Sequence, residues 1–287
     1  MKRVLITGKG SYIGSHFRDY LKEFPNDYYV EELDVRDDSW KQFDFSKFDV
    51  VYHVAGLAHS TPDESQRAIY YKVNTDLTYE IAKKSKDSGV KQFIFMSSII
   101  VYGSGKIGED RVITKDTPLT PDNFYGDSKK QAEIKITPLE EETFKIVIVR
   151  PPMIYGPQSK GNYPLLAKFA KKTPIFPTLK NQRSMLFLGN LMEFIKLMID
   201  NEENGIFLPQ NEKYVSSYEL VKMISEINNH KIHFTSIFNP FIKMLSKQVY
   251  VNKVFGNLII DKSLSTYKEN YCKYDFKESI EITEERS

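Results

Sequence analysis

Three side chains in the middle of the sequence have the types and the spacing that proton transfer requires. Tyr125 and Lys129 are four residues apart, and Ser98 follows an apolar run upstream. If residues 123–135 form a helix, Tyr125 and Lys129 lie on one face of it, and a nearby ammonium lowers the pKa of a phenol from about 10. Such a tyrosine can exchange a proton with an oxygen whose carbon gains or loses hydride. On its own, the pair also fits an ordinary helix with a surface tyrosine and lysine.

A glycine-rich turn near the N-terminus predicts a binding site for a pyrophosphate. Residues 3–7 form an apolar run typical of a buried strand, and the turn over residues 8–14 (GKGSYIG) leads into a helix. Free backbone N–H groups and the helix dipole at such a turn attract an anion, and glycine allows close approach. Because a strand precedes the turn and a helix follows it, dinucleotide binding is favoured over a plain turn.

The choice between NAD and NADP is left open by the next strand. Residues 28–33 are predicted to form this strand, and Asp34 falls twenty residues after Gly14. A carboxylate at that distance binds the adenosine ribose of NAD, whereas an arginine nearby accommodates a 2'-phosphate. Arg36 follows two residues later, so both cofactors remain compatible with the sequence.

Two further strands carry polar or small residues to their carboxyl ends, where sites form in an open parallel sheet. Residues 49–54 lead to Ala55 and Gly56, and residues 92–96 lead to Ser97 and Ser98. Between these strands, residues 64–88 have helical periodicity, and we expect Asn74 to bridge that helix to the strands. His53 is expected to be structural. His59, just past the strand end, fits either a substrate contact or a solvated loop.

The order of elements predicts an α/β fold, a Rossmann-type doubly wound parallel sheet with a smaller C-terminal α/β lobe. We expect the first domain over residues 1–157 and the lobe over 158–287, with later chain crossings back to the first. Residues 104–122 are expected to form a loop over the site, and the tail from Lys277 to fray. The stripe over residues 238–249 is interpreted as an amphipathic helix that closes the lobe, with a membrane or a partner as alternatives.

Composition narrows the function classes. The 287 residues contain 40 Lys and Arg against 38 Asp and Glu, a net charge of +2 that does not suggest nucleic-acid binding. The only cysteine, Cys272, excludes an intramolecular disulfide and fits a reducing compartment. No apolar run approaches the roughly 20 residues of a membrane span. We therefore expect a cytoplasmic protein with no integral membrane segment and no metal site.

Taken together, these motifs resemble the extended short-chain dehydrogenase/reductase family of nucleotide-sugar enzymes, the relatives of UDP-glucose 4-epimerase. The resemblance spans about residues 2–225. It is carried by Thr7-Gly8-x-x-Ser11-x-x-Gly14, His53-x-Ala55-Gly56, Ser98-x-x-Val101-Tyr102-Gly103, Tyr125-x-x-x-Lys129, the segment Arg150 to Pro157, and Arg183. It implies a homodimer through the helix that bears Tyr125, and Ser98, Tyr125 and Lys129 as the catalytic residues.

The same resemblance implies two sets of binding residues. Those expected to bind NAD(P) are Gly8, Gly10, Ser11, Tyr12, Ile13, Asp34, Val35, Arg36, Ala55, Gly56, Asn74, Ser97, Tyr125, Lys129 and Pro151. Those expected to bind a UDP-sugar are Ala58, His59, Ser98, Met153, Asn162 and Arg183.

Three departures from the family pattern are informative. Ser11 replaces the middle glycine of the turn, and Gly10 beside it is expected to restore the close approach. Met153 replaces the usual asparagine near the nicotinamide, so Asn162 is the candidate for that diphosphate contact. Dehydratases of the family carry an acidic pair directly after the catalytic serine or threonine, but here these positions are Ile99 and Ile100. Dehydration is therefore not expected.

The branch that this combination most resembles reduces UDP-4-keto-6-deoxy-hexosamines and forms UDP-N-acetylquinovosamine for surface polysaccharides. The expected activity is therefore an NAD(P)H-dependent nucleotide-sugar 4-ketoreductase, with NADPH slightly favoured over NADH. A UDP-hexose 4-epimerase that keeps tightly bound NAD is an alternative, because it needs the same three catalytic residues. A non-catalytic NAD(P)-binding sensor on the same fold is a second alternative.

Overall fold

The computed structural model describes residues 1–58 and 63–285. The chain forms two compact units and crosses between them several times. Unit 1 consists of residues 1–103, 119–150 and 192–208, and unit 2 of residues 104–118, 151–191 and 209–287. These bounds differ from the sequence-based division at residue 157. Residues 104–118 belong to unit 2 because they pair with a strand there, and residues 192–208 add a strand to the sheet of unit 1.

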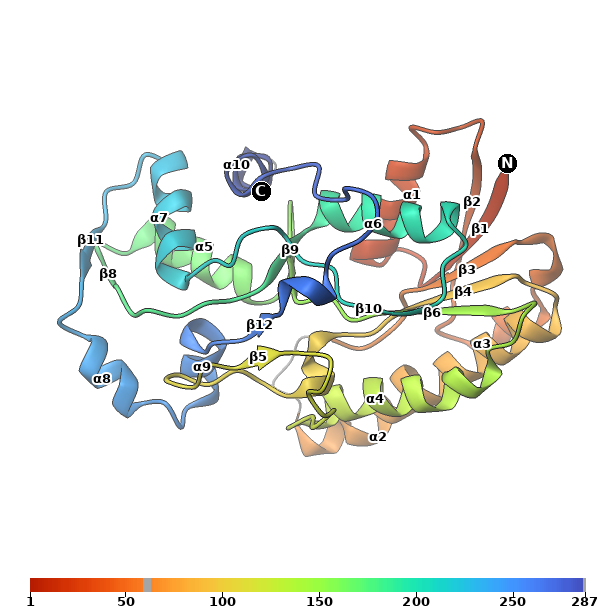
Figure 1. The fold of residues 1–287 in the computed structure, drawn as a ribbon, viewed down its shortest axis with the longest axis horizontal. Helices are drawn as coiled ribbons and strands as arrows, with labels where there is room; N and C mark the ends of the chain where they lie inside the picture. Colours follow the sequence, from red (N-terminus) through yellow and green to blue (C-terminus); the bar gives the residue numbers. More distant parts are fainter. Residues whose placement is uncertain (59–62, 286–287) are drawn as a thin grey trace. The chain divides into compact units, whose positions relative to one another are not determined.

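Unit 1 is built on a six-stranded sheet in which every neighbouring pair is parallel. Its order is β10-β6-β4-β3-β1-β2 (Figure 1). The strands are β1 (Lys2–Thr7), β2 (Tyr28–Leu33), β3 (Val50–His53), β4 (Gln92–Met96), β6 (Lys145–Val149) and β10 (Gly205–Phe207). The chain order reverses between β1 and β3, which is where an open α/β sheet forms its ligand crevice. The predicted fold class is confirmed.

Helices cover both faces of this sheet. They are α1 (Tyr12–Leu21), α2 (Arg67–Tyr71), α3 (Leu77–Asp87) and α4 (Phe124–Ile136), and α6 (Leu188–Asp200) leads from unit 2 into unit 1. Short 3-10 turns span Asp38–Gln42, Phe45–Lys47, Glu64–Gln66, Ile99–Tyr102 and Thr137–Leu139. Gly89 has a φ of +78°, which favours glycine and ends α3 as predicted.

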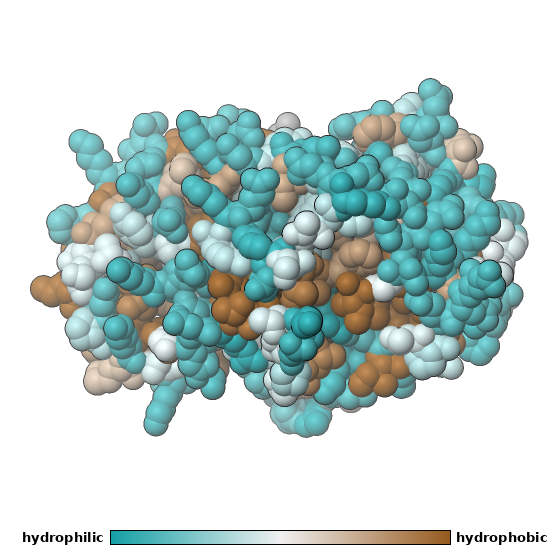
Figure 2. Space-filling model, viewed as in Figure 1, coloured by the Kyte–Doolittle hydropathy of each residue, from teal (hydrophilic) through white to brown (hydrophobic). Residues whose placement is uncertain are grey.

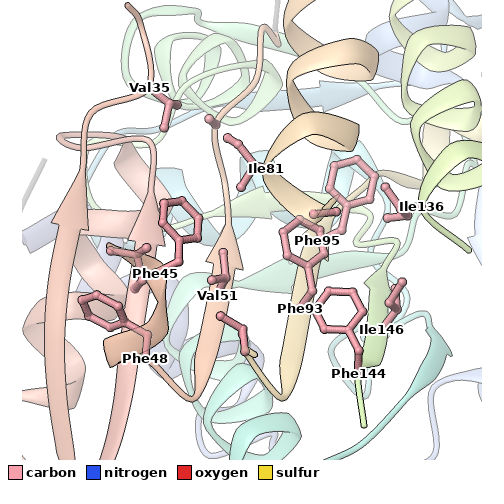
Figure 3. Close-up of a cluster of buried hydrophobic side chains, with 14 of the residues drawn as sticks. Val35, Phe45, Phe48, Val51, Ile81, Phe93, Phe95, Ile136, Phe144 and Ile146 are labelled. Atoms are coloured by element: carbon pink, nitrogen blue, oxygen red, sulfur yellow. The ribbon is translucent and has the colours of Figure 1, made fainter. Parts of the chain in front are cut away.

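The core on one face of the sheet is rich in phenylalanine. Figure 3 shows Phe93 and Phe95 of β4 among Ile81 of α3 and Ile136 of α4. Strand side chains alternate between faces, so Tyr52, next to Val51, points to the other face and packs on Phe17 of α1 at 5.1 Å between ring centroids. Both faces are therefore buried, which explains why these strands are almost continuously apolar.

Unit 2 contains three two-stranded parallel sheets and five helices of its own among the described residues. The sheets pair β5 (Val112–Ile113) with β12 (Ile259–Ile260), β7 (Met153–Tyr155) with β9 (Met185–Phe187), and β8 (Ile175–Pro177) with β11 (His233–Thr235). The helices are α5 (Asn162–Lys172), α7 (Ser217–Ile227), α8 (Asn239–Met244), α9 (Val249–Phe255) and α10 (Phe276–Glu285), with a 3-10 turn at Lys262–Leu264. A capping box of Ser216 and Glu219 starts α7.

Three local predictions are corrected in unit 2. The tail does not fray at Lys277, because α10 buries Ile280 and the Ser279 hydroxyl, which lies 2.6 Å from the Tyr155 hydroxyl. The loop over residues 104–122 contains β5. Residues 238–249 form parts of two short helices, and α8 buries none of its side chains, so this stripe does not close a core. In the part of the chain that is described, no helix is both long and apolar enough to cross a bilayer.

Candidate active site

The structure brings Ser98 and Tyr125 together. Ser98 follows β4 and caps the 3-10 turn at Ile99–Tyr102, with its Oγ accepting a hydrogen bond from Ile100 N at 3.3 Å. Tyr125 lies in the first turn of α4, which Asn123 caps. A Cβ on Gly126 would lie 2.7 Å from the carbonyl oxygen of Ile100, so only glycine lets α4 start this close. The hydroxyl groups of Ser98 and Tyr125 are hydrogen-bonded.

Lys129 does not act on Tyr125 in the way that their spacing predicted. Its Nζ donates to the backbone carbonyl of Met96 at 2.8 Å and lies 4.7 Å from the centre of the Phe95 ring. Burial lowers the pKa of Lys129 to about 8, against the opposing effect of Glu133. The predicted fall in the pKa of Tyr125 is wrong for the free chain. Burial raises that pKa to about 12, although the hydrogen bond with Ser98 acts in the opposite direction.

Asn74 forms the predicted bridge between its helix and the strand ends. It lies fully buried in a π-helical turn, Lys72–Asp76, between α2 and α3. Its Oδ1 accepts from Leu57 N at 2.7 Å, and its Nδ2 donates to Leu57 O at 3.1 Å and to Ser128 Oγ at 3.0 Å. These contacts join the segment after β3 to the helix that carries Tyr125. Direct contact of Asn74 with a cofactor stays a prediction.

The glycine-rich turn has the geometry of an anion site. A Cβ on Gly8 would lie 2.9 Å from Ala55 N, so the turn passes directly over the segment after β3. Gly10 has a φ of +75°, and a Cβ there would meet nothing within 4 Å. Ser11 caps α1 by accepting from Gly14 N at 3.2 Å. The turn therefore has open space at Gly10 and the N-terminus of α1 beside it. Such a site suits a pyrophosphate.

A second glycine and a buried hydroxyl extend this site. A Cβ on Gly56 would lie 3.1 Å from both Asn74 Oδ1 and Lys129 Nζ. Gly56 therefore lies against the side chains of both residues. The hydroxyl of Tyr12 is buried and has no hydrogen-bond partner within the described residues. A buried hydroxyl normally forms a hydrogen bond, so we expect that of Tyr12 to bond to a group outside the chain. The residues of unit 1 therefore fit an NAD(P) molecule.

The side chains after β2 form an exposed ion pair. Arg36 Nε lies 2.9 and 3.0 Å from the two carboxylate oxygens of Asp34. This arginine lowers the pKa of Asp34 to about 2. Val35 between them is buried and directs both polar side chains outward. Both a ribose-binding carboxylate and a phosphate-binding guanidinium are thus present, and the cofactor choice stays open.

A buried polar network that was not predicted from the sequence surrounds Glu133. The carboxylate of Glu133 accepts hydrogen bonds from Ser97 Oγ and from Arg150 Nε, the latter at 3.1 and 3.2 Å. Arg150 also donates to the Tyr102 hydroxyl at 2.6 Å. The network ties the segment that carries Ser98 to α4 and to the end of β6. One feature of the sequence could have indicated this network. Glu133 follows Lys129 by four residues, which places both on one face of the helix.

The predicted substrate residues are distributed between the two units. Ala58 belongs to unit 1, and His59 lies outside the described residues. Met153, Asn162 and Arg183 belong to unit 2, and so does Pro151, which was predicted to bind the cofactor. There, Asn162 Nδ2 and Arg183 Nη1 both donate to the carbonyl oxygen of Lys253, at 3.3 and 2.5 Å. The structure therefore brings Asn162 and Arg183 together.

Arg183 is a cation without a carboxylate partner in the described part of the chain. Its guanidinium contacts only backbone oxygens, those of Lys253 and Val254, and burial lowers its pKa to about 10. A guanidinium remains protonated at that pKa and has donors left for an anion. This arrangement suits a phosphate group better than a structural ion pair.

Residues 4–208 match the NAD-dependent epimerase/dehydratase family, a stretch that contains every motif of unit 1 described above. The chain belongs to this family. It is an NAD(P)-dependent enzyme of the extended short-chain dehydrogenase/reductase class, among the nucleotide-sugar epimerases, dehydratases and reductases. The resemblance noted in the sequence is thereby confirmed at the level of the family.

Two relatives illustrate the range of this family. The chain is 29% identical to the UDP-glucose 4-epimerase of Vibrio cholerae, over 91% of this chain and 88% of that protein. It is 32% identical to the N-acetyl-alpha-D-glucosaminyl-diphospho-ditrans,octacis-undecaprenol 4-epimerase of Escherichia coli O157:H7, over 69% of this chain and 60% of that protein.

Solved structures share the fold across nearly the whole chain. The UDP-N-acetylglucosamine 4-epimerase of Methanobrevibacter ruminantium M1, in complex with UDP-N-acetylmuramic acid, matches with a TM-score of 0.77 at 18% identity, over 99% of this chain and 97% of that chain. A dTDP-4-dehydrorhamnose reductase from Clostridium acetobutylicum ATCC 824 matches with a TM-score of 0.73 at 18% identity, over 98% of both chains. Family members with epimerase and reductase names thus share this fold.

Proposed function

We propose that the chain is a nucleotide-sugar 4-ketoreductase that reduces a UDP-4-keto-6-deoxy-N-acetylhexosamine. The observation that carries this proposal is the hydrogen-bonded pair of Ser98 and Tyr125 beside the buried ammonium of Lys129. NAD(P)H, when bound, supplies the hydride for carbon 4. Ser98, Tyr125 and Lys129 together deliver the proton that the reduced oxygen must receive.

The protonation state of Tyr125 suits the reductive direction. With a pKa raised to about 12, its hydroxyl carries a proton at neutral pH and acts as a general acid. In the proposed reaction it donates this proton to the oxygen on carbon 4 while Ser98 donates a hydrogen bond to the same oxygen. In the proposed reaction, Lys129 binds the nicotinamide ribose and stabilises the phenolate that remains.

The diphosphate of the substrate is assigned to unit 2. Arg183 supplies a charged donor without a carboxylate partner among the described residues, and Asn162 supplies an amide beside it. Met153 is half-buried on β7 and cannot make the polar contact of the asparagine usual in the family. Asn162 and Arg183 both donate to the carbonyl oxygen of Lys253. Their proximity supports the proposal that together they replace the contact of that asparagine with the diphosphate.

Dehydration is disfavoured by the residues that follow Ser98. An elimination needs an acid and a base beside the sugar, but Ile99 is buried and apolar, and Ile100 carries no titratable group. Nearby Glu133 is engaged by Arg150 and Ser97, and Asp127 accepts a hydrogen bond from Tyr71 at 2.5 Å. These carboxylates are therefore committed to other partners.

A UDP-hexose 4-epimerase is the second candidate, and the epimerase names of the two relatives favour it. Its chemistry uses the same tyrosine twice, once as base and once as acid. An epimerase retains its NAD through the catalytic cycle, whereas a reductase must exchange its cofactor at every turnover. Cofactor retention therefore distinguishes the two functions.

The deciding experiment measures the nucleotide that the purified protein carries and then its turnover. A reductase is expected to exchange its cofactor freely and to consume one NADPH or NADH for each UDP-4-keto-6-deoxy-N-acetylhexosamine, read from the near-ultraviolet band of reduced nicotinamide. Tightly held NAD, no net oxidation and interconversion of UDP-hexoses would overturn the reductase in favour of the epimerase.

We further propose a homodimer that uses α4. Ile134 lies on this helix and is 52% exposed, so an apolar side chain of α4 is available for a contact between two copies of the chain. Light scattering of the parent protein and of Ile134→Glu tests this directly. A monomeric parent would contradict it.

A further inference from the structure

Unit 2 exposes a concentrated group of apolar side chains on and around α8 and α9. Fifteen large hydrophobic residues are exposed in the described chain, and six of them lie between residues 237 and 250. They are Ile237, Phe238, Phe241, Met244, Val249 and Tyr250. Ile237 is 75% exposed and Met244 71%. We call this group the apolar patch.

Exposed apolar side chains are denser in this segment than in the rest of the described chain. Figure 2 shows one face of the molecule, on which hydrophilic side chains predominate and hydrophobic surface is restricted to separate areas. A contiguous exposed apolar area on a soluble fold marks an interaction surface more often than isolated exposed residues do. The other nine exposed hydrophobic residues are scattered through the sequence, from Met1 to Tyr274.

The charged side chains within the segment that carries the patch are all of one sign. Residues 227–260 contain four lysines, Lys231, Lys243, Lys247 and Lys253, and no aspartate or glutamate. Lys243 and Lys247 are exposed, and neither forms an ion pair with any described residue. Lys253 is half-buried with its Nζ 5.6 Å from the centre of the Tyr250 ring. The surface is therefore both apolar and cationic.

The C-terminal part of the segment is anchored, so α9 is held in a defined position. Asn252 donates from Nδ2 to Ser246 O at 2.6 Å and accepts from Ile107 N at 3.0 Å. At the end of α9, Val254 is buried, and its carbonyl accepts a hydrogen bond from Ser217 Oγ. These contacts hold α9 to the body of unit 2, while α8, drawn in blue in Figure 1, buries no side chain.

We propose that the apolar patch docks onto the surface of an anionic lipid bilayer. Aromatic and aliphatic side chains of such a segment enter the boundary between headgroups and acyl chains, and lysines beside them reach anionic headgroups with their long stems. Each lysine near such a surface strengthens binding by roughly fivefold. An acidic protein partner would satisfy the lysines as well, but the interleaving of lysine with phenylalanine, methionine and tyrosine favours a bilayer.

The test uses the full chain and vesicles of two compositions. One kind contains phosphatidylcholine alone, and the other contains equal parts of phosphatidylcholine and phosphatidylglycerol. Co-sedimentation is expected to be at least about tenfold stronger with the anionic vesicles and to weaken as salt is raised. Equal or absent binding to both kinds would overturn the proposal.

Paired variants separate the apolar from the cationic contribution. Lys243→Glu with Lys247→Glu is expected to weaken binding at least about 25-fold, because two attractive contacts are lost. Phe241→Asp with Met244→Asp is expected to abolish binding. Matched controls are Lys115→Glu and Ile206→Asp, both at exposed positions that are not part of the patch. Controls that lose as much binding as the patch variants would refute the assignment.

A spectroscopic readout tests contact with lipid directly. The only tryptophan, Trp40, is buried in unit 1, so Tyr250→Trp in a Trp40→Phe background reports on the patch. Its emission is expected to shift to the blue when anionic vesicles are added. If the emission stays unchanged and the patch variants instead dissociate an oligomer in light scattering, the patch is a contact between copies of the chain and the proposal is wrong.

Discussion

Asn162 and Arg183 donate to one acceptor, the backbone carbonyl oxygen of Lys253, at 3.3 and 2.5 Å. The two residues are twenty-one positions apart in the sequence and lie on α5 and directly before β9. Because they share this acceptor, the amide of Asn162 and the guanidinium of Arg183 lie close to each other.

Arg183→Gln is expected to weaken binding of UDP without unfolding the protein. A hydrogen bond to a charged group contributes about 1.5–3 kcal/mol, which corresponds to roughly 10- to 150-fold in Kd. Titration calorimetry with UDP measures the change. Arg67→Gln is the matched control, because Arg67 is an exposed arginine paired with Glu64. Unchanged UDP affinity in Arg183→Gln would remove this residue from the substrate site.

Tyr125→Phe is expected to lower kcat by about 100- to 10,000-fold, the usual contribution of a positioned general acid. Cofactor binding should persist, because the substitution removes one oxygen and keeps the ring. Turnover and cofactor affinity are measured on the same preparation. Tyr29→Phe, on an exposed tyrosine of β2, is the control. A variant that retained most of its turnover would exclude Tyr125 as the acid.

Glu133→Gln is expected to destabilise unit 1 by about 3–5 kcal/mol, because it leaves the buried guanidinium of Arg150 without its countercharge. Denaturant unfolding measures this. Asp87→Asn breaks the exposed pair with Lys83 and should cost less than about 1 kcal/mol.

The same variant has a second consequence that a merely structural role would not produce. Glu133 raises the pKa of Lys129, so its removal should lower that pKa further below about 8. Any limb of the pH–rate profile that reports Lys129 should then move to lower pH. A profile that kept its shape in a folded variant would show that Glu133 has no electrostatic effect on the site.

His53 is expected to make the fold sensitive to acid. It is fully buried between the hydroxyl groups of Thr7, at 2.6 Å from Nδ1, and Thr78, at 3.0 Å from Nε2. The Thr78 hydroxyl donates its proton to Asn74 O, so Nε2 must donate to Thr78 and Nδ1 accepts from Thr7. The ring is therefore held neutral.

Burial lowers the pKa of His53 to about 3, whereas an unfolded histidine titrates near pH 6.5. Between these values the unfolded chain binds a proton that the folded chain does not. The contribution is complete above about pH 6.5 and falls by about 1.4 kcal/mol per pH unit as the pH drops toward 3. Unfolding free energies measured from pH 7 to 4 should show this slope, and His53→Asn should flatten it. An equally steep slope in the variant would contradict the assignment.

The amino-acid sequence by itself determined the parallel sheet and the helix that carries both Tyr125 and Lys129. The predicted bounds of β1, β2 and β4 lie within one residue of those in the structure. The Gly8 turn, the Asn123 cap before Tyr125 and the Ser216 capping box are local patterns, and each occurs in the structure. Local hydrogen bonding and side-chain alternation are set by neighbours in the chain, which explains why these elements were predictable.

Only the tertiary structure decided where the charged side chains point. The spacing of Tyr125 and Lys129 is helical, but the ammonium reaches Met96 O because β4 lies beneath α4. The network of Glu133, Arg150, Ser97 and Tyr102 joins segments from four parts of the sequence, and α10 is ordered by packing on α7. The exposure of the apolar patch also depends on what the fold leaves uncovered. Contacts between distant segments carry no periodic signal in the sequence, so they had to be seen in the structure.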